Sequence, residues 1–182
     1  MKKLIMWNVI TIDGYFQGVE PWDLNFHTSV YGDELEQFSI EQLDSAEAII
    51  YGSVTYAGMA LYWKNETGPV ADRVNTMKKY VCTRTLTTAD WTNTEILNDA
   101  VEDINKLKLE GEGNLFVFGS GKLCNSLIKA GLFDEYRLCI APMILGNGRQ
   151  LFEEGLPMET LELTSNETLK MGGVMVRYGV RG

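Results

Sequence analysis

The tripeptide Gly119-Ser120-Gly121 is the clearest pattern in the sequence for holding a ligand. It follows an apolar run, residues 115–118, that is typical of a buried strand, and it precedes Leu123, Leu127 and Ile128 at helical spacing. Glycine lets a phosphate approach the backbone, and the free N–H groups and dipole of a helix start favour an anion. The pattern therefore predicts a strand, a glycine turn and a helix. A dinucleotide or another phosphorylated ligand is the first hypothesis, and an ordinary tight turn is the alternative.

Two common glycine motifs do not fit this turn. A P-loop would need glycine at position 116 and serine or threonine at position 123, where the chain has Phe116 and Leu123, so Lys122 is not a P-loop lysine. The dinucleotide fingerprint G-x-G-x-x-G would need a third glycine at position 124, which is Cys124. The turn therefore belongs to another plan of nucleotide binding.

Three more loops with glycine, hydroxyl or charged residues follow predicted strands. They are the loop 13–23 after the apolar strand 3–12, the turn Gly52-Ser53-Val54-Thr55 after the strand 48–51, and Thr83-Arg84-Thr85 at the end of the strand 79–83. Loops at the carboxyl ends of strands are where α/β proteins hold ligands. Ser53 or Thr55 could also cap a short helix that continues to about Leu61.

Periodicity places the remaining elements around these loops. Apolar positions at helical spacing predict a helix over 31–45, and Asp99 with Glu102 has the spacing of a capping box at the start of a helix that runs to Gly111. Shorter elements are expected over 72–78 (helix or turn), 91–97 (edge strand), 136–141 (strand) and 158–164 (strand). Gly172-Gly173 predicts a hairpin turn between residues 169–171 and a last strand over 174–180.

Composition limits the classes of partner. The chain has 182 residues, 45% of them hydrophobic, which indicates one globular domain over residues 1–182. Sixteen basic against 25 acidic residues give a formal charge of −9, which argues against nucleic acid or an anionic membrane. No stretch approaches the roughly 18 apolar residues of a membrane span, and the N-terminus is interpreted as a first strand rather than a signal peptide.

The cysteines indicate neither a metal site nor a disulfide framework. Cys82, Cys124 and Cys139 form no C-x-x-C pair, are odd in number and each lie in an apolar segment. Buried thiols in a cytoplasmic protein are the expectation, and no metal is expected.

The order of these segments resembles the dihydrofolate reductase-like family, and in particular the reductase domain of bacterial riboflavin biosynthesis and its stand-alone relatives. The resemblance covers nearly the whole chain. It rests on Thr11-Ile12-Asp13-Gly14-Tyr15, Gly52-x-x-Thr55-Tyr56, the strand 79–85, Phe118-Gly119-Ser120-Gly121 with Leu123, and the segment from Asp134-Glu135 through Pro142 and Gly146-Asn147-Gly148 to Leu151-Phe152.

This resemblance implies an α/β fold: a three-layer, mostly parallel twisted sheet with helices on both faces and a C-terminal antiparallel hairpin. It also implies an NADPH-dependent reductase that transfers a hydride to a small pterin-, pyrimidine- or flavin-precursor-like substrate, and a homodimer. The implied cofactor residues are Gly52, Ser53 and Thr55 at the phosphates, Thr83 and Arg84 at the adenosine ribose and its 2′-phosphate, and Gly119, Ser120, Gly121, Lys122 and Leu123 at the second phosphate turn. In the loop after the first strand, Asp13 is the candidate catalytic residue, and Tyr15 and Trp22 are candidates for the substrate.

Some residues depart from the family pattern. Ser53 stands where arginine is common, Ser120 interrupts a run of glycines, and the buried acid of true dihydrofolate reductases is missing after Trp22, so dihydrofolate is not the expected substrate. Ser53 and Ser120 support an alternative: a nucleotide- or flavin-binding protein of this fold without reductase turnover.

Single residues also have simpler interpretations. Asp13-Gly14 can be an ordinary turn, and Arg84 can be a surface arginine. His27 is the only histidine, and in its polar loop it is expected to be exposed to solvent and without a role. Asn147 and Arg149 are expected to shape a loop, without chemistry.

Overall fold

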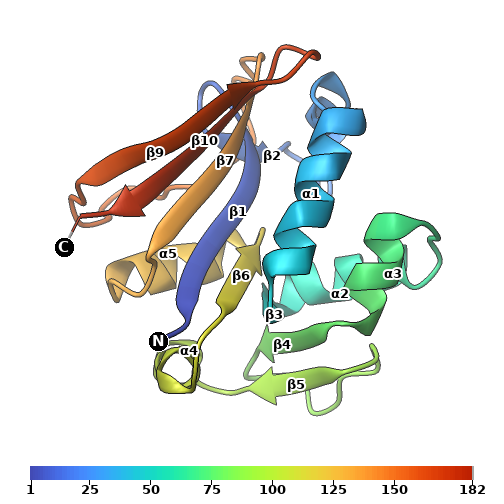
Figure 1. Cartoon of the computed structure of the whole chain (residues 1–182), viewed down its shortest axis with the longest axis vertical. Coiled ribbons are helices and arrows are strands. Elements are labelled where there is room, and N and C mark those ends of the chain that lie inside the picture. The colour runs from blue at the N-terminus through green and yellow to red at the C-terminus, as the bar shows by residue number, and fades with distance from the viewer. Residues whose placement is uncertain (182) are drawn as a thin grey trace.

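The computed structural model of the protein describes residues 1–181 as a twisted sheet between two layers of helices (Figure 1). The strands are β1 (Lys3–Thr11), β2 (Tyr15–Gln17), β3 (Ala48–Gly52), β4 (Lys78–Cys82), β5 (Thr94–Leu97), β6 (Asn114–Phe118), β7 (Glu135–Ala141), β8 (Arg149–Gln150), β9 (Leu161–Thr168) and β10 (Val174–Val180). The helices are the 3-10 helix η1 (Asn25–Ser29) and α1 (Asp33–Ser45), α2 (Ser53–Trp63), α3 (Pro69–Thr76), α4 (Ala100–Leu109) and α5 (Gly121–Lys129).

The main sheet has eight strands in the order β5-β4-β3-β6-β1-β7-β10-β9, and β2 pairs separately with β8. The first six strands of this order (β5, β4, β3, β6, β1 and β7) are parallel to one another. Strand β10 runs antiparallel to both β7 and β9. The expected mostly parallel sheet with helices on both faces and a C-terminal antiparallel hairpin is therefore confirmed.

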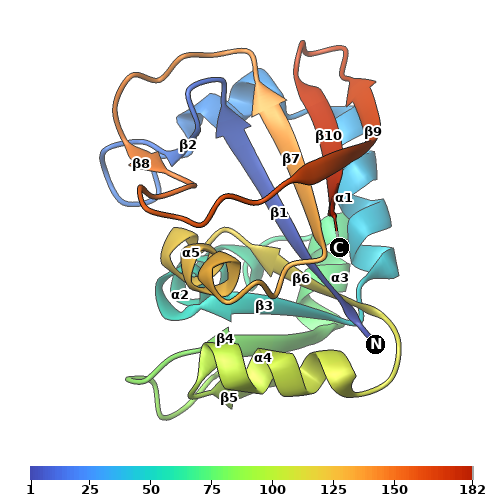
Figure 2. The same ribbon diagram turned by 90° about the vertical axis from the view of Figure 1, so that its left-hand side faces the viewer.

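Side chains of β1 alternate between two buried layers, which explains why its sequence is almost continuously apolar. Leu4 and Met6 pack in a cluster that includes residues of α4 and α5. Ile5 and Trp7 point to the other face, where they pack with residues of α1 and η1. Figure 2 shows α4 and α5 on one side of the sheet and α1 on the other.

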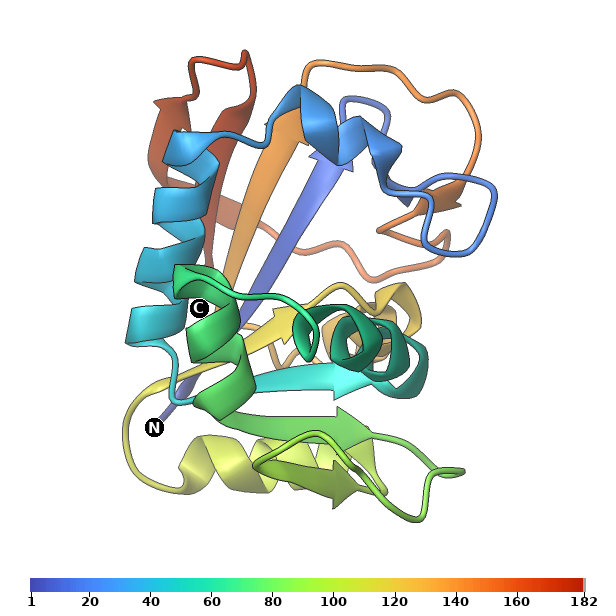
Figure 3. The same cartoon turned by 90° about the vertical axis from the view of Figure 1, so that its right-hand side faces the viewer.

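A crevice opens where β1 and β6 separate. Their pairing ends at Trp7↔Phe118, whereas β1 remains paired with β7 as far as Thr11↔Ala141. Figure 3 shows the carboxyl ends of β1 and β6 pointing in different directions. Strand β6 lies between β3 and β1, and the next strand in the chain, β7, lies on the opposite side of β1. The direction of the strand order therefore changes at β1 and β6, and such a switch point is where α/β sheets bind ligands.

Some helix ends differ from the sequence-based expectations. Helix α1 begins at Asp33 rather than residue 31, α2 continues to Trp63, and α3 begins earlier, at Pro69. The prediction that Ser53 or Thr55 caps α2 is wrong, because Gly52 is the N-cap and no side chain caps that helix.

The capping box of α4 is confirmed on one side only. The Asp99 carboxylate accepts a hydrogen bond from the Glu102 N–H, but the Asp99 N–H donates to the carboxylate of Asp103 rather than to that of Glu102. The C-terminal hairpin also has a different first strand: β9 runs from Leu161 to Thr168, and residues 169–171 belong to the turn. Leu169 is 3% exposed, so this apolar residue is buried within the turn and is not part of a paired strand.

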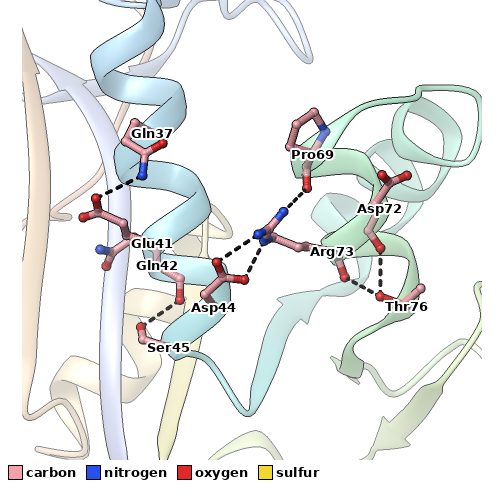
Figure 4. Close-up of polar contacts among 9 residues, drawn as sticks. All are labelled: Gln37, Glu41, Gln42, Asp44, Ser45, Pro69, Asp72, Arg73 and Thr76. Atoms are coloured by element: carbon pink, nitrogen blue, oxygen red, sulfur yellow. Dashed lines mark hydrogen bonds and ion pairs between the residues drawn. The ribbon is translucent and has the colours of Figure 1, made fainter.

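An ion pair ties α1 to α3 on the helix layer that borders the crevice (Figure 4). The Arg73 guanidinium donates to both carboxylate oxygens of Asp44, at 2.5 and 2.9 Å, and to the carbonyl of Pro69 at 2.9 Å. This bidentate pair links the two helices at the surface of the protein. Within residues 1–181, no helix combines the length and the apolar character that crossing a membrane requires.

Candidate functional site

A cleft of about 880 Å³ lies at the carboxyl ends of β1, β3, β4 and β6. The structure brings most of the sequence-predicted residues together there. Those that line the cleft are Trp22, Gly52, Ser53, Thr55, Thr83, Arg84, Gly119, Ser120, Gly121, Lys122 and Leu123. Volume and position are those of a small-molecule or cofactor site.

Two helix N-termini open into this cleft. Helix α2 begins at Ser53 and α5 at Gly121, and their first backbone N–H groups have no partner within the helix. Neither helix has an acidic residue in its first turn, whereas α1, α3 and α4 each have at least one. Since a carboxylate there would repel an anion and compete for the N–H groups, the two helix starts at the cleft are the ones left open to a phosphate.

Ser120 joins the two glycine turns. Its hydroxyl accepts a hydrogen bond of 2.8 Å from the Gly52 N–H, so it does not cap α5, and the Gly52 N–H is not free for a ligand. Ser120 has φ +61°, in the left-handed region that costs a serine free energy. At Gly119, also at positive φ, an added Cβ would lie 3.3 Å from Cγ2 of Thr55, so glycine allows the two turns to meet closely.

Three cationic side chains line the cleft: Arg84, Lys122 and Arg149. None of the three takes part in an ion pair within the described part of the chain. In a protein with a formal charge of −9, they provide local positive charge for an anionic ligand. Arg149, to which the sequence assigned no chemistry, is thus a site candidate that sequence reasoning missed.

Thr83 supports the loop that carries Arg84. It is 7% exposed, and its hydroxyl oxygen accepts hydrogen bonds of 3.2 Å from the N–H groups of Thr85 and Leu86. Arg84 itself is exposed at the end of β4. The loop therefore has a hydrogen-bonded base and an exposed charged side chain.

Two aromatic side chains, Phe16 in β2 and Trp22 in the loop after it, line the cleft and contact the helices that begin there. The Trp22 ring lies so close to α2 that a Cβ on Gly58 would be 1.9 Å from Trp22 Cζ2. The Phe16 ring rests on the start of α5, where a Cβ on Gly121 would be 2.9 Å from it. Trp22 has φ +65°, a conformation rarely adopted by a bulky residue, and strain of this kind is concentrated at functional sites.

Asp13 and Tyr15 differ from expectation, since neither is among the residues that line the cleft. The Asp13 carboxylate accepts hydrogen bonds from the Thr11 hydroxyl (2.6 Å) and from the N–H groups of Leu145 (3.1 Å) and Gly146 (2.7 Å). The Thr11 hydroxyl and these two N–H groups hold the pKa of Asp13 at about 2, although desolvation opposes the shift. The turn at Gly14, with φ +85°, thus directs Asp13 towards the loop after β7.

His27 is not the solvent-exposed residue that the sequence suggested. Its ring lines the cleft, packs edge-on against Phe26 at 4.6 Å between centroids, and has an Nε2 atom that is buried without a partner in the described structure. Burial lowers the pKa of His27 to about 4, so the imidazole is neutral at neutral pH.

Asn8 is a second cleft residue that sequence reasoning missed. It is 6% exposed and lines the crevice from β1. The available signal was a single polar residue within the apolar run of a buried strand. Among the residues that the structure describes, no three His, Cys, Asp or Glu side chains gather as a metal site would require.

A model of the RibD C-terminal domain family matches residues 2–176. A curated relative, the uncharacterized protein YyaP of Bacillus subtilis (strain 168), is 26% identical over 189 residues, which cover 100% of this chain and 96% of the relative.

Three solved structures share the fold. A putative riboflavin biosynthesis protein of Shewanella sp. PV-4 has a TM-score of 0.82 at 18% identity, over 99% of both chains. A pyrimidine reductase-like protein of Corynebacterium diphtheriae has a TM-score of 0.66 at 14% identity, over 99% of this chain and 92% of that one. A diaminohydroxyphosphoribosylaminopyrimidine deaminase/5-amino-6-(5-phosphoribosylamino)uracil reductase of Thermotoga maritima has a TM-score of 0.67 at 14% identity, over 99% of this chain and 57% of that one.

Proposed function

Because the chain belongs to the RibD C-terminal domain family, we propose that it is an NADPH-dependent reductase that transfers a hydride to a small heterocyclic substrate of pterin, pyrimidine or flavin-precursor type. The observation that carries this proposal is the convergence of two acid-free helix N-termini and the Thr83-Arg84 loop on one cleft. The similar folds of the pyrimidine reductase-like protein of C. diphtheriae and of the uracil reductase of T. maritima support a pyrimidine-type substrate.

The two helix starts would hold the diphosphate of the cofactor. The N–H groups at the starts of α2 and α5 lie on either side of the bond between Ser120 and Gly52, which keeps the two turns together. Their dipoles favour the negative charge. Lys122, exposed at the start of α5, adds a cation there.

Arg84 would distinguish NADPH from NADH. It lies at the end of β4, two strands from β6 in the sheet, and it is free of ion pairs within residues 1–181. A guanidinium in this position suits a 2′-phosphate, because it can donate two parallel hydrogen bonds to phosphate oxygens.

The chemistry requires orientation and a dry cleft. When bound, NADPH would supply a hydride with its electron pair to an electron-poor carbon of the substrate, and a proton would be added at the neighbouring heteroatom. Phe16 and Trp22, seated on α5 and α2, would exclude water from the reacting end of the cleft.

A second candidate is a nucleotide- or flavin-binding protein without turnover. It is favoured by the state of two possible proton donors: the Asp13 carboxylate is engaged outside the cleft lining, and the His27 imidazole is neutral. A panel of pterins, pyrimidines and quinones separates the two candidates, with loss of NADPH absorbance as the readout. Turnover of any compound supports the reductase, whereas NADPH binding with no turnover across the panel selects the binding protein.

A further inference from the structure

Three buried side-chain polar atoms in the described structure have no hydrogen-bond partner: Asn8 Nδ2, His27 Nε2 and Thr94 Oγ1. Two of these residues, Asn8 and His27, line the cleft, and Thr94 does not. A buried donor without a partner destabilises the folded protein, so such groups are rare unless a ligand or water pairs with them. Asn8 and His27 are therefore the two residues of the cleft lining whose unpaired side-chain atoms a polar ligand would satisfy.

Asn8 lies where the crevice begins. It is the first residue of β1 after the last pair with β6, Trp7↔Phe118, and its Cα is paired only with Leu138 of β7. At 6% exposure it is well buried, and the alternation along β1 puts it on the same face as Leu4 and Met6.

The Cys124 thiol beside Asn8 is only a weak hydrogen-bond partner for its side chain. The amide lies beside the thiol of Cys124 in α5, and it lowers the pKa of that thiol against the larger effect of burial, which raises it to about 12. The thiol donates instead to the carbonyl of Gly119 at 3.2 Å. A leucine would suit this otherwise apolar cluster better than a carboxamide, so the amide must have a different reason to be there.

The order of strands suggests which part of a ligand reaches Asn8. Arg84 follows β4, Gly52 ends β3, Gly119 follows β6, and Asn8 is in β1, and these four strands are consecutive neighbours in the sheet. At about 4.8 Å between strands, the step from β4 to β1 covers roughly 14 Å, which an extended dinucleotide spans. With its 2′-phosphate at Arg84 and its diphosphate at the glycine turns, NADPH would place its nicotinamide end at β1.

We infer that the Asn8 carboxamide positions the nicotinamide ring by donating a hydrogen bond from Nδ2 to the carbonyl oxygen of the nicotinamide carboxamide. The inference rests on the proposed use of NADPH and adds a role for a residue that the glycine turns do not include. The bond also fixes the rotation of the ring about its glycosidic link, and so the face that meets the substrate.

The test compares two probes on Asn8→Leu, a substitution of similar shape without polar atoms. NADPH carries the carboxamide, whereas 2′-phospho-ADP-ribose has the same 2′-phosphate and diphosphate but no nicotinamide. We expect Asn8→Leu to weaken NADPH binding by about tenfold, which one hydrogen bond supports, and to leave the affinity for 2′-phospho-ADP-ribose within twofold. Its melting temperature should equal or exceed that of the unmodified protein, because an unpaired buried donor has been removed.

Thr94→Val is the matched control, since it removes an equally unpaired buried polar atom outside the cleft. It should stabilise the fold without changing the affinity for either probe. Asn8→Ser, whose shorter hydroxyl would not reach the ring, provides the same comparison if the leucine variant does not fold. Equal effects on both probes, or no loss of NADPH affinity, would overturn the inference. Failure of the unmodified protein to bind either probe would instead overturn the proposed cofactor.

Discussion

The backbone N–H of Gly52 donates a 2.8 Å hydrogen bond to the hydroxyl of Ser120, residues that are 68 positions apart in the chain. This bond joins the end of β3 to the turn after β6 and sets the spacing of the two helix N-termini at the cleft. An additional Cβ on Gly52 would lie 3.1 Å from the Ser120 oxygen, so glycine relieves a tight contact at this close approach. The serine that interrupts the glycine run thus has a structural role.

Ser120→Ala should lower the free energy of unfolding by about 1 to 2 kcal/mol, because it leaves the Gly52 N–H without its partner while keeping the positive φ. Ser120→Gly should lower the free energy of unfolding by less than Ser120→Ala does, since glycine adopts φ +61° without strain. Urea unfolding of the two variants measures the difference. Ser126→Ala, which removes an exposed hydroxyl from the same helix, is the control and should change stability little. Equal losses in the two Ser120 variants would contradict the strain argument.

Gly58→Ala should displace the Trp22 ring from α2, because the new Cβ would lie 1.9 Å from the ring. We expect a red-shifted tryptophan emission and weaker ligand binding. In a Trp22→Ala background the same substitution should only stabilise, by about 1 kcal/mol, since alanine is the better helix former. An identical effect in the two backgrounds would show that Trp22 does not rest on Gly58 in solution.

Stability should fall as the pH drops from 6.5 to 4. The pKa of His27 is lowered by burial from 6.5 to about 4, so in this window the unfolded chain binds a proton that the folded chain does not. The loss approaches about 3 kcal/mol at the acidic end, and above pH 6.5 this residue adds no pH dependence. His27→Gln should flatten the curve in this window. An unchanged slope in the variant would mean that His27 is accessible to solvent.

Asp13 should affect stability at a lower pH than His27 does. Its pKa is about 2, lowered chiefly by the Thr11 hydroxyl and the N–H groups of Gly146 and Leu145, so its stabilisation is present above pH 3.8 and is lost as the pH falls towards 2. Asp13→Asn should remove that dependence and loosen the loop after β7. If the catalytic prediction for Asp13 is also right, the variant should lose turnover at temperatures at which it remains folded.

Local patterns were sufficient to predict much of the fold. The strand, turn and helix around Gly119 follow from residues that are adjacent in the chain, whereas the mostly parallel sheet was implied by the resemblance to the dihydrofolate reductase-like family. The hairpin partner was missed because Leu169 has the apolar character of a strand residue but is buried in a turn. Periodicity does not distinguish these two ways of burying a side chain.

Side-chain direction was harder to predict than element type. The carboxylate of Asp13 is directed by N–H groups more than 130 residues away, and His27 is buried by its packing on Phe26. The contacts of Trp22 with Gly58 and of Phe16 with Gly121 likewise depend on helices that come later in the chain. Such contacts leave no spacing pattern, although one polar residue in a buried strand, Asn8, was a usable signal.

A comparative titration with NADPH and NADH tests the central claim most directly. We expect the protein to bind NADPH more tightly, and saturation at about 100 times the dissociation constant should add about 2.7 kcal/mol to the free energy of unfolding. Arg84→Ala should abolish the preference by weakening NADPH alone, whereas Lys129→Ala, which removes an exposed cation outside the cleft lining, should leave both affinities unchanged. No binding of either nucleotide, or equal losses for both in Arg84→Ala, would contradict the account.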